Sequence, residues 1–90
     1  MARAQFSSLL ARHFNLSRRE IEVPACSLNQ LLAILQNDIH GFAETVLTDD
    51  GDVKPVITII LNGRILSGHH DDVVLCESDK VLILPLLAGG

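Results

Sequence analysis

Apolar and polar residues alternate over two short stretches near the start of the chain, and this alternation predicts two strands. The first stretch covers residues 3–9, with Phe6 on its apolar side. The second covers residues 19–23 and ends at Pro24, because proline has no N–H group to donate to a β-ladder. Residues 10–18 form a modest connection, so we expect the two strands to pair as a hairpin.

A leucine stripe follows and predicts the main helix, over residues 27–37. Ser27 suits the N-cap position, and Gln30, three residues later, completes a capping-box pattern. The stripe has the spacing of one helical face and consists of Leu28, Leu31, Leu32 and Leu35. Core packing explains such a stripe better than contact with a cofactor. Residues 42–47 are expected to add one further helical turn.

The second half of the chain predicts three more strands. Residues 56–61 are a β-branched run of strand length, and Asn62-Gly63 directly after them is typical of a two-residue hairpin turn. A short return strand then begins at Ile65. Residues 67–79 are expected to be mostly loop, and the last strand covers 81–84. Three apolar residues of that loop are expected to hold it to the core: Val73, Val74 and Leu75.

The predicted sheet has more apolar residues than one helix can cover, since a helix packs against one face of a sheet only. If Ile57 and Ile59 face the helix, Ile60 points away from it. The same alternation turns Leu82 and Leu84 outward, so the uncovered face carries an apolar patch. We interpret this patch as a docking face for a partner protein; self-association or a tightly curled sheet is the alternative.

Composition indicates one small domain with an aliphatic core. Of the 90 residues, 48% are hydrophobic, yet only three are aromatic. The formal charge of −4 argues against nucleic-acid binding, which requires Lys and Arg to neutralise phosphates. The sequence also contains no apolar run of about 18 residues that would span a membrane. The arginine-rich residues 1–20 resemble a mitochondrial presequence, but the fold needs them as its first strand, so we expect a cytoplasmic protein.

Metal and redox motifs are weak in this sequence. Cys26 and Cys76 lack Cys-x-x-Cys or Cys/His spacing, so we expect reduced thiols, with a single disulfide as the alternative. Residues 49–52 indicate a solvated turn rather than a calcium loop, because a glycine stands where a ligand is required. The side chains of His69-His70 diverge in an extended segment, so no metal site is expected there.

The last residues of the sequence are unusual. Gly89-Gly90 closely follows an apolar strand, and glycine without a Cβ atom gives a tail that is both mobile and thin enough to enter a narrow channel. Residues 56–64 and 79–90 resemble the MoaD/ThiS-type sulfur carriers of the ubiquitin-like β-grasp fold, and the capped helix falls where that family has its helix. One departure is Glu77-Ser78-Asp79, where the family usually has glycine between two acidic residues.

The resemblance implies an α+β fold, with a mixed four- to five-stranded sheet and one main helix packed on one face. It also implies a β-grasp domain over residues 1–85 and a flexible C-terminal tail over 86–90. An E1-like activating enzyme would use ATP to adenylate the Gly90 carboxylate, and a sulfur donor protein would then displace AMP and leave a thiocarboxylate. No cofactor would be bound permanently.

In molybdopterin synthesis, the small-subunit relatives insert this tail into the large subunit of molybdopterin synthase. By resemblance, Gly89 and Gly90 form the reactive end. The partner-binding residues are Ile60, Ile65, Leu82, Leu84, Pro85, Leu86, Leu87 and Ala88. Three alternatives stay open: a carrier for thiamine thiazole or other sulfur metabolism, a ubiquitin-like modifier conjugated through Gly90, and an interaction domain that does not use its tail.

Overall fold

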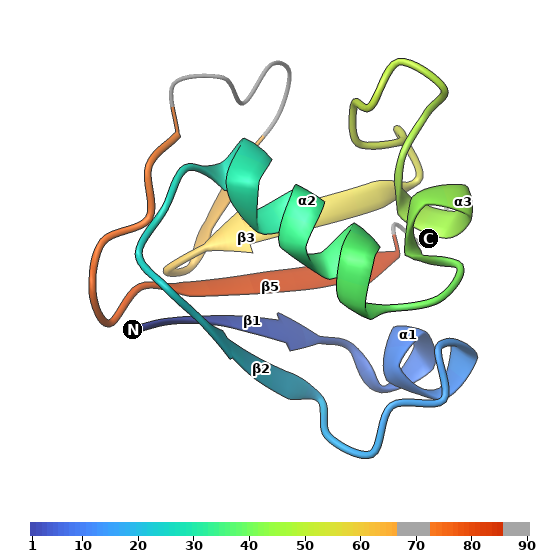
Figure 1. The fold of residues 1–90 in the computed structure, drawn as a ribbon, viewed down its shortest axis with the longest axis horizontal. Coiled ribbons are helices and arrows are strands. Elements are labelled where there is room, and N and C mark those ends of the chain that lie inside the picture. Colours follow the sequence, from blue (N-terminus) through green and yellow to red (C-terminus); the bar gives the residue numbers. More distant parts are fainter. Residues whose placement is uncertain (67–72, 86–90) are drawn as a thin grey trace.

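The computed structural model describes residues 1–66 and 73–85, and in these residues five strands form one mixed sheet. The strands are β1 (Ala2–Phe6), β2 (Glu20–Val23), β3 (Ile57–Leu61), β4 (Arg64–Leu66) and β5 (Lys80–Pro85), and the helices are α1 (Ser8–His13), α2 (Leu28–Asp38) and α3 (Phe42–Val46). The order across the sheet is β2-β1-β5-β3-β4; β1 and β5 are parallel, and the other neighbouring pairs are antiparallel. The predicted α+β architecture is confirmed, and Figure 1 shows α2 lying across one face of the sheet.

The first two strands pair as predicted, but a helix that the sequence analysis missed lies between them. The strand predicted over 3–9 stops at Phe6, and the connection predicted over 10–18 begins inside α1. The Ser7 hydroxyl accepts a hydrogen bond from the Leu10 N–H at 3.3 Å and caps this helix. Helix α1 has only 6 residues, too few to display a repeated apolar stripe, so periodicity could not reveal it.

Helix α2 forms where the leucine stripe predicts it and begins with the predicted capping box. The Ser27 hydroxyl accepts from the Gln30 N–H at 3.1 Å, and the Gln30 side-chain oxygen accepts from the Ser27 N–H at 3.0 Å. All four stripe leucines are buried. The further turn expected after this helix is α3, which buries Phe42 and Val46.

Three aromatic rings attach the two short helices to the sheet. Phe6 of β1 lies 6.0 Å from Phe14, the residue that ends α1, and 6.3 Å from Phe42 of α3, measured between ring centroids. Both contacts are edge-to-face, and Phe14 and Phe42 lie 5.9 Å apart. Such pairs contribute about 0.5–1.5 kcal/mol each beyond the burial of their surface. These contacts therefore hold α1 and α3 in place although neither helix is long enough to be stable alone.

Both tight turns predicted from the sequence are present. Asn62 and Gly63 have φ angles of 50° and 87°, as a type I′ hairpin turn requires, and they join β3 to β4. In the 49–52 turn, the Gly51 N–H donates to the Thr48 carbonyl at 3.0 Å.

The segment that precedes β5 departs from prediction at one residue. Leu75 is buried and Val73 packs against the core, as expected. Val74, however, is 63% exposed, so its predicted core contact is wrong. Val74 forms an isolated β-bridge with Ser27, and in such an extended segment neighbouring side chains point to opposite sides.

Candidate functional site

The face of the sheet that α2 leaves uncovered carries a row of side chains drawn from all five strands. In order from β2 to β4, the register aligns Glu20, Gln5, Leu82, Ile60 and Ile65. In the next row, Leu84 of β5 lies opposite Thr58 of β3. The structure therefore brings together four residues predicted to bind a partner, and we call these the outer patch: Ile60, Ile65, Leu82 and Leu84.

Burial confirms which way the central strands face. On β5, Val81 and Ile83 are fully buried under α2, whereas the alternate residues Leu82 and Leu84 are only partly buried. On β3 the same alternation leaves Ile60 partly covered. Ile65, on the edge strand β4, is 65% exposed and is the most accessible member of the outer patch. The outer patch therefore has partly buried side chains at its centre, on β3 and β5, and an exposed side chain, Ile65, at the β4 edge.

Strand β5 is the middle strand of the sheet and ends at Pro85. Its last residue, Pro85, pairs with Ile57 at the start of β3. On the other side, the Ser7 N–H donates to the Ile83 carbonyl at 3.0 Å, next to the start of α1. The other predicted tail and partner-binding residues lie outside the described residues: Leu86, Leu87, Ala88, Gly89 and Gly90. His69 and His70 lie outside them as well.

The opposite end of β5 is fixed by a hydrogen-bond network that the sequence analysis missed. The Asp79 carboxylate accepts from the Cys76 N–H at 2.7 Å and from the Asn62 side-chain amide at 2.9 Å. The Lys80 N–H in turn donates to the Asn62 side-chain oxygen at 2.9 Å. The bond from Cys76, and then the bond from Asn62, hold the pKa of Asp79 below its ordinary value. The network thus ties the β3–β4 turn to the first residue of β5.

Ser78 occupies the position where the family's acidic-glycine-acidic pattern has its glycine. Its φ angle is 72°, in the left-handed region that favours glycine. The backbone therefore keeps a conformation suited to glycine even though a serine occupies the position, and this costs about 1–2 kcal/mol.

In the described residues the two cysteines form no disulfide, and no metal cluster is present. Cys26 and Cys76 are both free, so the disulfide alternative is not realised. Burial raises the pKa of the Cys26 thiol, whereas Cys76 is exposed. Within residues 1–66 and 73–85, no three His, Cys, Asp or Glu side chains come close enough to hold a metal ion. None of the helices described there has the length and apolar character needed to cross a membrane.

Sequence comparison connects this arrangement to a known group of proteins. An Archaeoglobus fulgidus protein named "Putative sulfur carrier protein" is 33% identical to this chain over 72 residues, which cover 79% of this chain and 82% of that protein. The chain belongs to the MoaD/ThiS-type family of ubiquitin-like sulfur carriers. No family model matches the sequence.

Solved structures confirm the fold of this sulfur-carrier family member. A chain of the Amycolatopsis orientalis BexX/CysO complex superposes with a TM-score of 0.81 at 16% identity, and the match covers 100% of both chains. Mycobacterium tuberculosis CysO gives a TM-score of 0.77 at 18% identity over 97% of this chain and 100% of that one. Small archaeal modifier protein 1 of Haloferax volcanii gives 0.72 at 17% identity over 96% and 97%. Identities this low show the shared ubiquitin-like β-grasp fold alone.

Proposed function

We propose that this sulfur carrier donates sulfur from a thiocarboxylate at Gly90 during molybdopterin synthesis. The observation that carries the proposal is membership of the sulfur-carrier family, shown by 33% identity over 72 residues. The position of β5 supports it, because the central strand leads directly into residues 86–90 from the middle of the sheet. The rest of the domain then serves to present this segment to other proteins.

The proposed chemistry begins at the Gly90 carboxylate, which is a poor acceptor for sulfur until one oxygen becomes part of a leaving group. An oxygen of the carboxylate attacks the α-phosphorus of ATP, pyrophosphate leaves, and an acyl-adenylate forms on an E1-like activating enzyme. The terminal sulfur of a persulfide on a sulfur donor protein then attacks the carbonyl carbon, AMP leaves with its oxygen, and an acyl disulfide forms. A reducing thiol attacks the donor's sulfur in this S–S bond, forms a disulfide with the donor and releases the thiocarboxylate. The resulting thiocarboxylate carries a soft sulfur nucleophile at the end of the chain. ATP belongs to the activating enzyme, so the carrier requires no resident cofactor in this scheme.

The outer patch gives the proposed carrier its contact with these enzymes. Specific interfaces combine an apolar centre with a polar rim. In the row that crosses the sheet, Gln5 and Glu20 border Leu82, Ile60 and Ile65 on the β1–β2 side, so the outer patch has polar residues along that side. Strand β5 ends at Pro85, and in this proposal the insertion segment begins directly after it. Leu86, Leu87 and Ala88 would then guide Gly89 and Gly90 into the large subunit of molybdopterin synthase.

The test is intact-mass analysis of the purified carrier after incubation with the E1-like enzyme, ATP and the sulfur donor. We expect the mass gain of one sulfur replacing one oxygen, located on the C-terminal peptide, and release of that sulfur when the molybdopterin synthase large subunit and its pterin substrate are added. A variant without Gly89 and Gly90 should gain no sulfur, while its thermal unfolding stays close to that of the full chain. A variant that still gains sulfur would contradict the proposal.

The same samples separate the alternatives. Covalent adducts of the carrier on lysines of larger proteins, without a free thiocarboxylate, would indicate a protein modifier instead. The thiocarboxylate could also be consumed by a thiazole-forming system and not by the molybdopterin synthase large subunit. That result would indicate a carrier for thiamine synthesis instead. Native material that extends beyond residue 90 would remove Gly90 as the reactive end.

A further inference from the structure

A hollow lies on the sheet beside the outer patch, at the β2 edge. It is lined by Arg3 and Gln5 of β1 and by the continuous segment 16–22, which contains the loop before β2 and most of β2 itself. Gln5 pairs with Leu82, so the hollow begins where the outer patch ends. A protein that docks on the outer patch would therefore extend over the hollow.

The loop that forms one wall of the hollow is held at both ends. At the end of α1, the Asn15 N–H donates to the Arg12 carbonyl at 3.1 Å and the Leu16 N–H donates to the Ala11 carbonyl at 2.8 Å, which is the pattern of a Schellman motif. Asn15 has the left-handed φ angle of 59° that this motif requires. At the other end, the Arg19 carbonyl accepts from the Phe6 N–H at 2.7 Å. The backbone that carries the loop arginines is thus attached to both α1 and β1.

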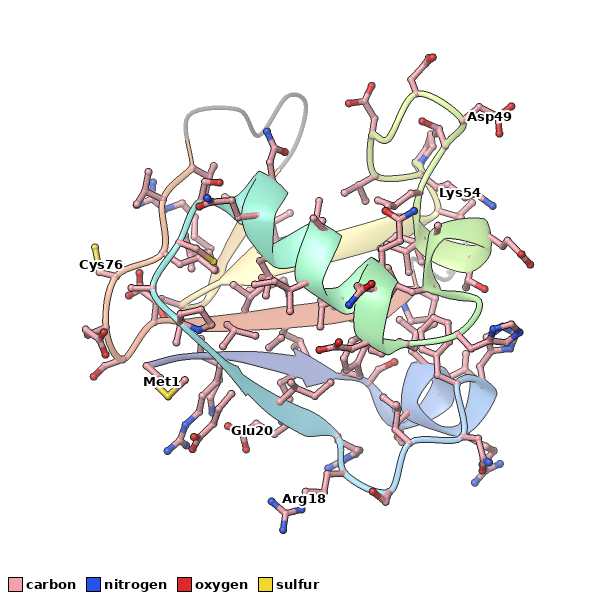
Figure 2. The ribbon with its side chains drawn as sticks, viewed as in Figure 1. Met1, Arg18, Glu20, Asp49, Lys54 and Cys76 are labelled. Atoms are coloured by element: carbon pink, nitrogen blue, oxygen red, sulfur yellow. The ribbon has the colours of Figure 1, made fainter. Side chains whose placement is uncertain are left out.

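The charges around the hollow are unequal. Arg3 pairs with Glu20 at 3.3 Å, and both side chains are partly exposed. Arg18 and Arg19 are exposed and, within the described part of the chain, have no carboxylate within 4.0 Å. Figure 2 shows Arg18 projecting from the loop away from the body of the domain, with Glu20 on the strand beyond it. Glu22 also lines the hollow, so three arginines face two glutamates, and the balance of +1 is positive in a protein whose net charge is −4.

We propose that this arginine-flanked hollow binds carboxylates of a partner protein, next to the apolar contact that the outer patch makes. The planar guanidinium group pairs bidentately with a carboxylate, and charges at the rim of an interface steer the partner and fix its orientation. The partner this surface fits therefore presents an apolar side chain flanked by Asp or Glu residues. The inference rests on the proposed function in one respect, since it takes the E1-like activating enzyme as that partner.

The experiment measures association and dissociation rates of the carrier with the purified E1-like enzyme over a range of salt concentrations. Arg18→Glu and Arg19→Glu are compared with Arg12→Glu, which changes the charge equally at an exposed arginine of α1 outside the hollow. We expect Arg18→Glu and Arg19→Glu to slow association roughly 3- to 10-fold at low salt and to flatten its salt dependence. Arg12→Glu should stay close to wild type, and all three variants should unfold at the wild-type temperature.

Equal effects of the three substitutions would overturn the proposal, because they would reflect net charge rather than the hollow. The same variants are tested for binding to single-stranded RNA. If the carrier binds this RNA more tightly than it binds the enzyme, and the binding depends on Arg18 and Arg19, the hollow is a nucleic-acid site and the proposal is overturned. The variant without Gly89 and Gly90 separates the two proposals. If it binds with the same arginine dependence, the hollow stands even where sulfur transfer at Gly90 fails.

Discussion

Replacing Asn62 should reveal how much stability the contact between the β3–β4 turn and β5 provides. Asn62 adopts a left-handed backbone, with φ of 50°, and its side chain makes two hydrogen bonds, one to Asp79 and one from the Lys80 N–H. Glycine tolerates the same backbone, so Asn62→Gly removes the side-chain bonds and leaves the turn intact. Asn62→Ala removes the bonds and also places a Cβ atom in the left-handed conformation without the local hydrogen bonding that asparagine offers.

The size of the loss follows from the two bonds. A net contribution of about 0.5–1.5 kcal/mol per hydrogen bond, taken near the lower end because Asn62 is exposed, gives about 1–2 kcal/mol for both. Asn62→Gly should lose this amount together with about 0.5–1 kcal/mol from the greater freedom of glycine in the unfolded chain. Asn62→Ala should lose the bond contribution and about 1–2 kcal/mol of backbone strain.

Asn15 provides the matched control. It has a similar φ angle, 59°, and within residues 1–66 and 73–85 its side chain makes no hydrogen bond. Asn15→Gly therefore changes the same residue type in the same conformation without breaking such bonds, and should cost less than Asn62→Gly by about 1–2 kcal/mol.

The assay is urea-induced unfolding, combined with hydrogen exchange of the Lys80 amide, which should exchange faster in Asn62→Gly than in wild type. If Asn62→Gly and Asn15→Gly have equal free energies of unfolding and the Lys80 amide remains protected, the network does not stabilise β5 and the reasoning is refuted.

Three further predictions concern the core, the outer patch and pH. Leu31→Ala should destabilise by about 2–5 kcal/mol in urea unfolding, because Leu31 lies on the fully buried face of α2; a change near zero would contradict its place in the core. Ile65→Asp should weaken binding to the activating enzyme in a titration, whereas Val74→Asp, at a valine of nearly equal exposure off the outer patch, should not; equal effects would show that the patch is not the contact. The lowered pKa of Asp79 means that its ionised form favours folding, so its contribution is fully present above the ordinary Asp pKa of about 3.9 and is lost as pH falls through the lowered folded value. Unfolding of Asp79→Asn should lack that acid-dependent loss, and identical pH profiles for the variant and wild type would show that the carboxylate is not held by its partners.

Several elements could be predicted because their signals are local. The Ser27 and Gln30 capping box, the leucine stripe of α2 and the Asn62-Gly63 turn each depend on residues a few positions apart, and all three appear as predicted. Alternation along β3 and β5 likewise fixed which side chains face α2 and which face outward, and so identified the outer patch. Helix α1 was not predicted, because its 6 residues are too few to show a repeating apolar pattern.

The sequence by itself thus determined the β-strands, the main helix and the family signature that ends in Gly89-Gly90. Only the tertiary structure decided that β5 occupies the centre of the sheet between β1 and β3, which places Gln5 beside Leu82 and Asp79 within reach of Asn62. It also placed Arg18 and Arg19 around the hollow that lies beside the outer patch. Secondary structure follows from interactions between neighbours in the chain, whereas these contacts join segments many residues apart. Such contacts depend on how the apolar faces of all the elements pack together, and no short stretch of sequence specifies that packing.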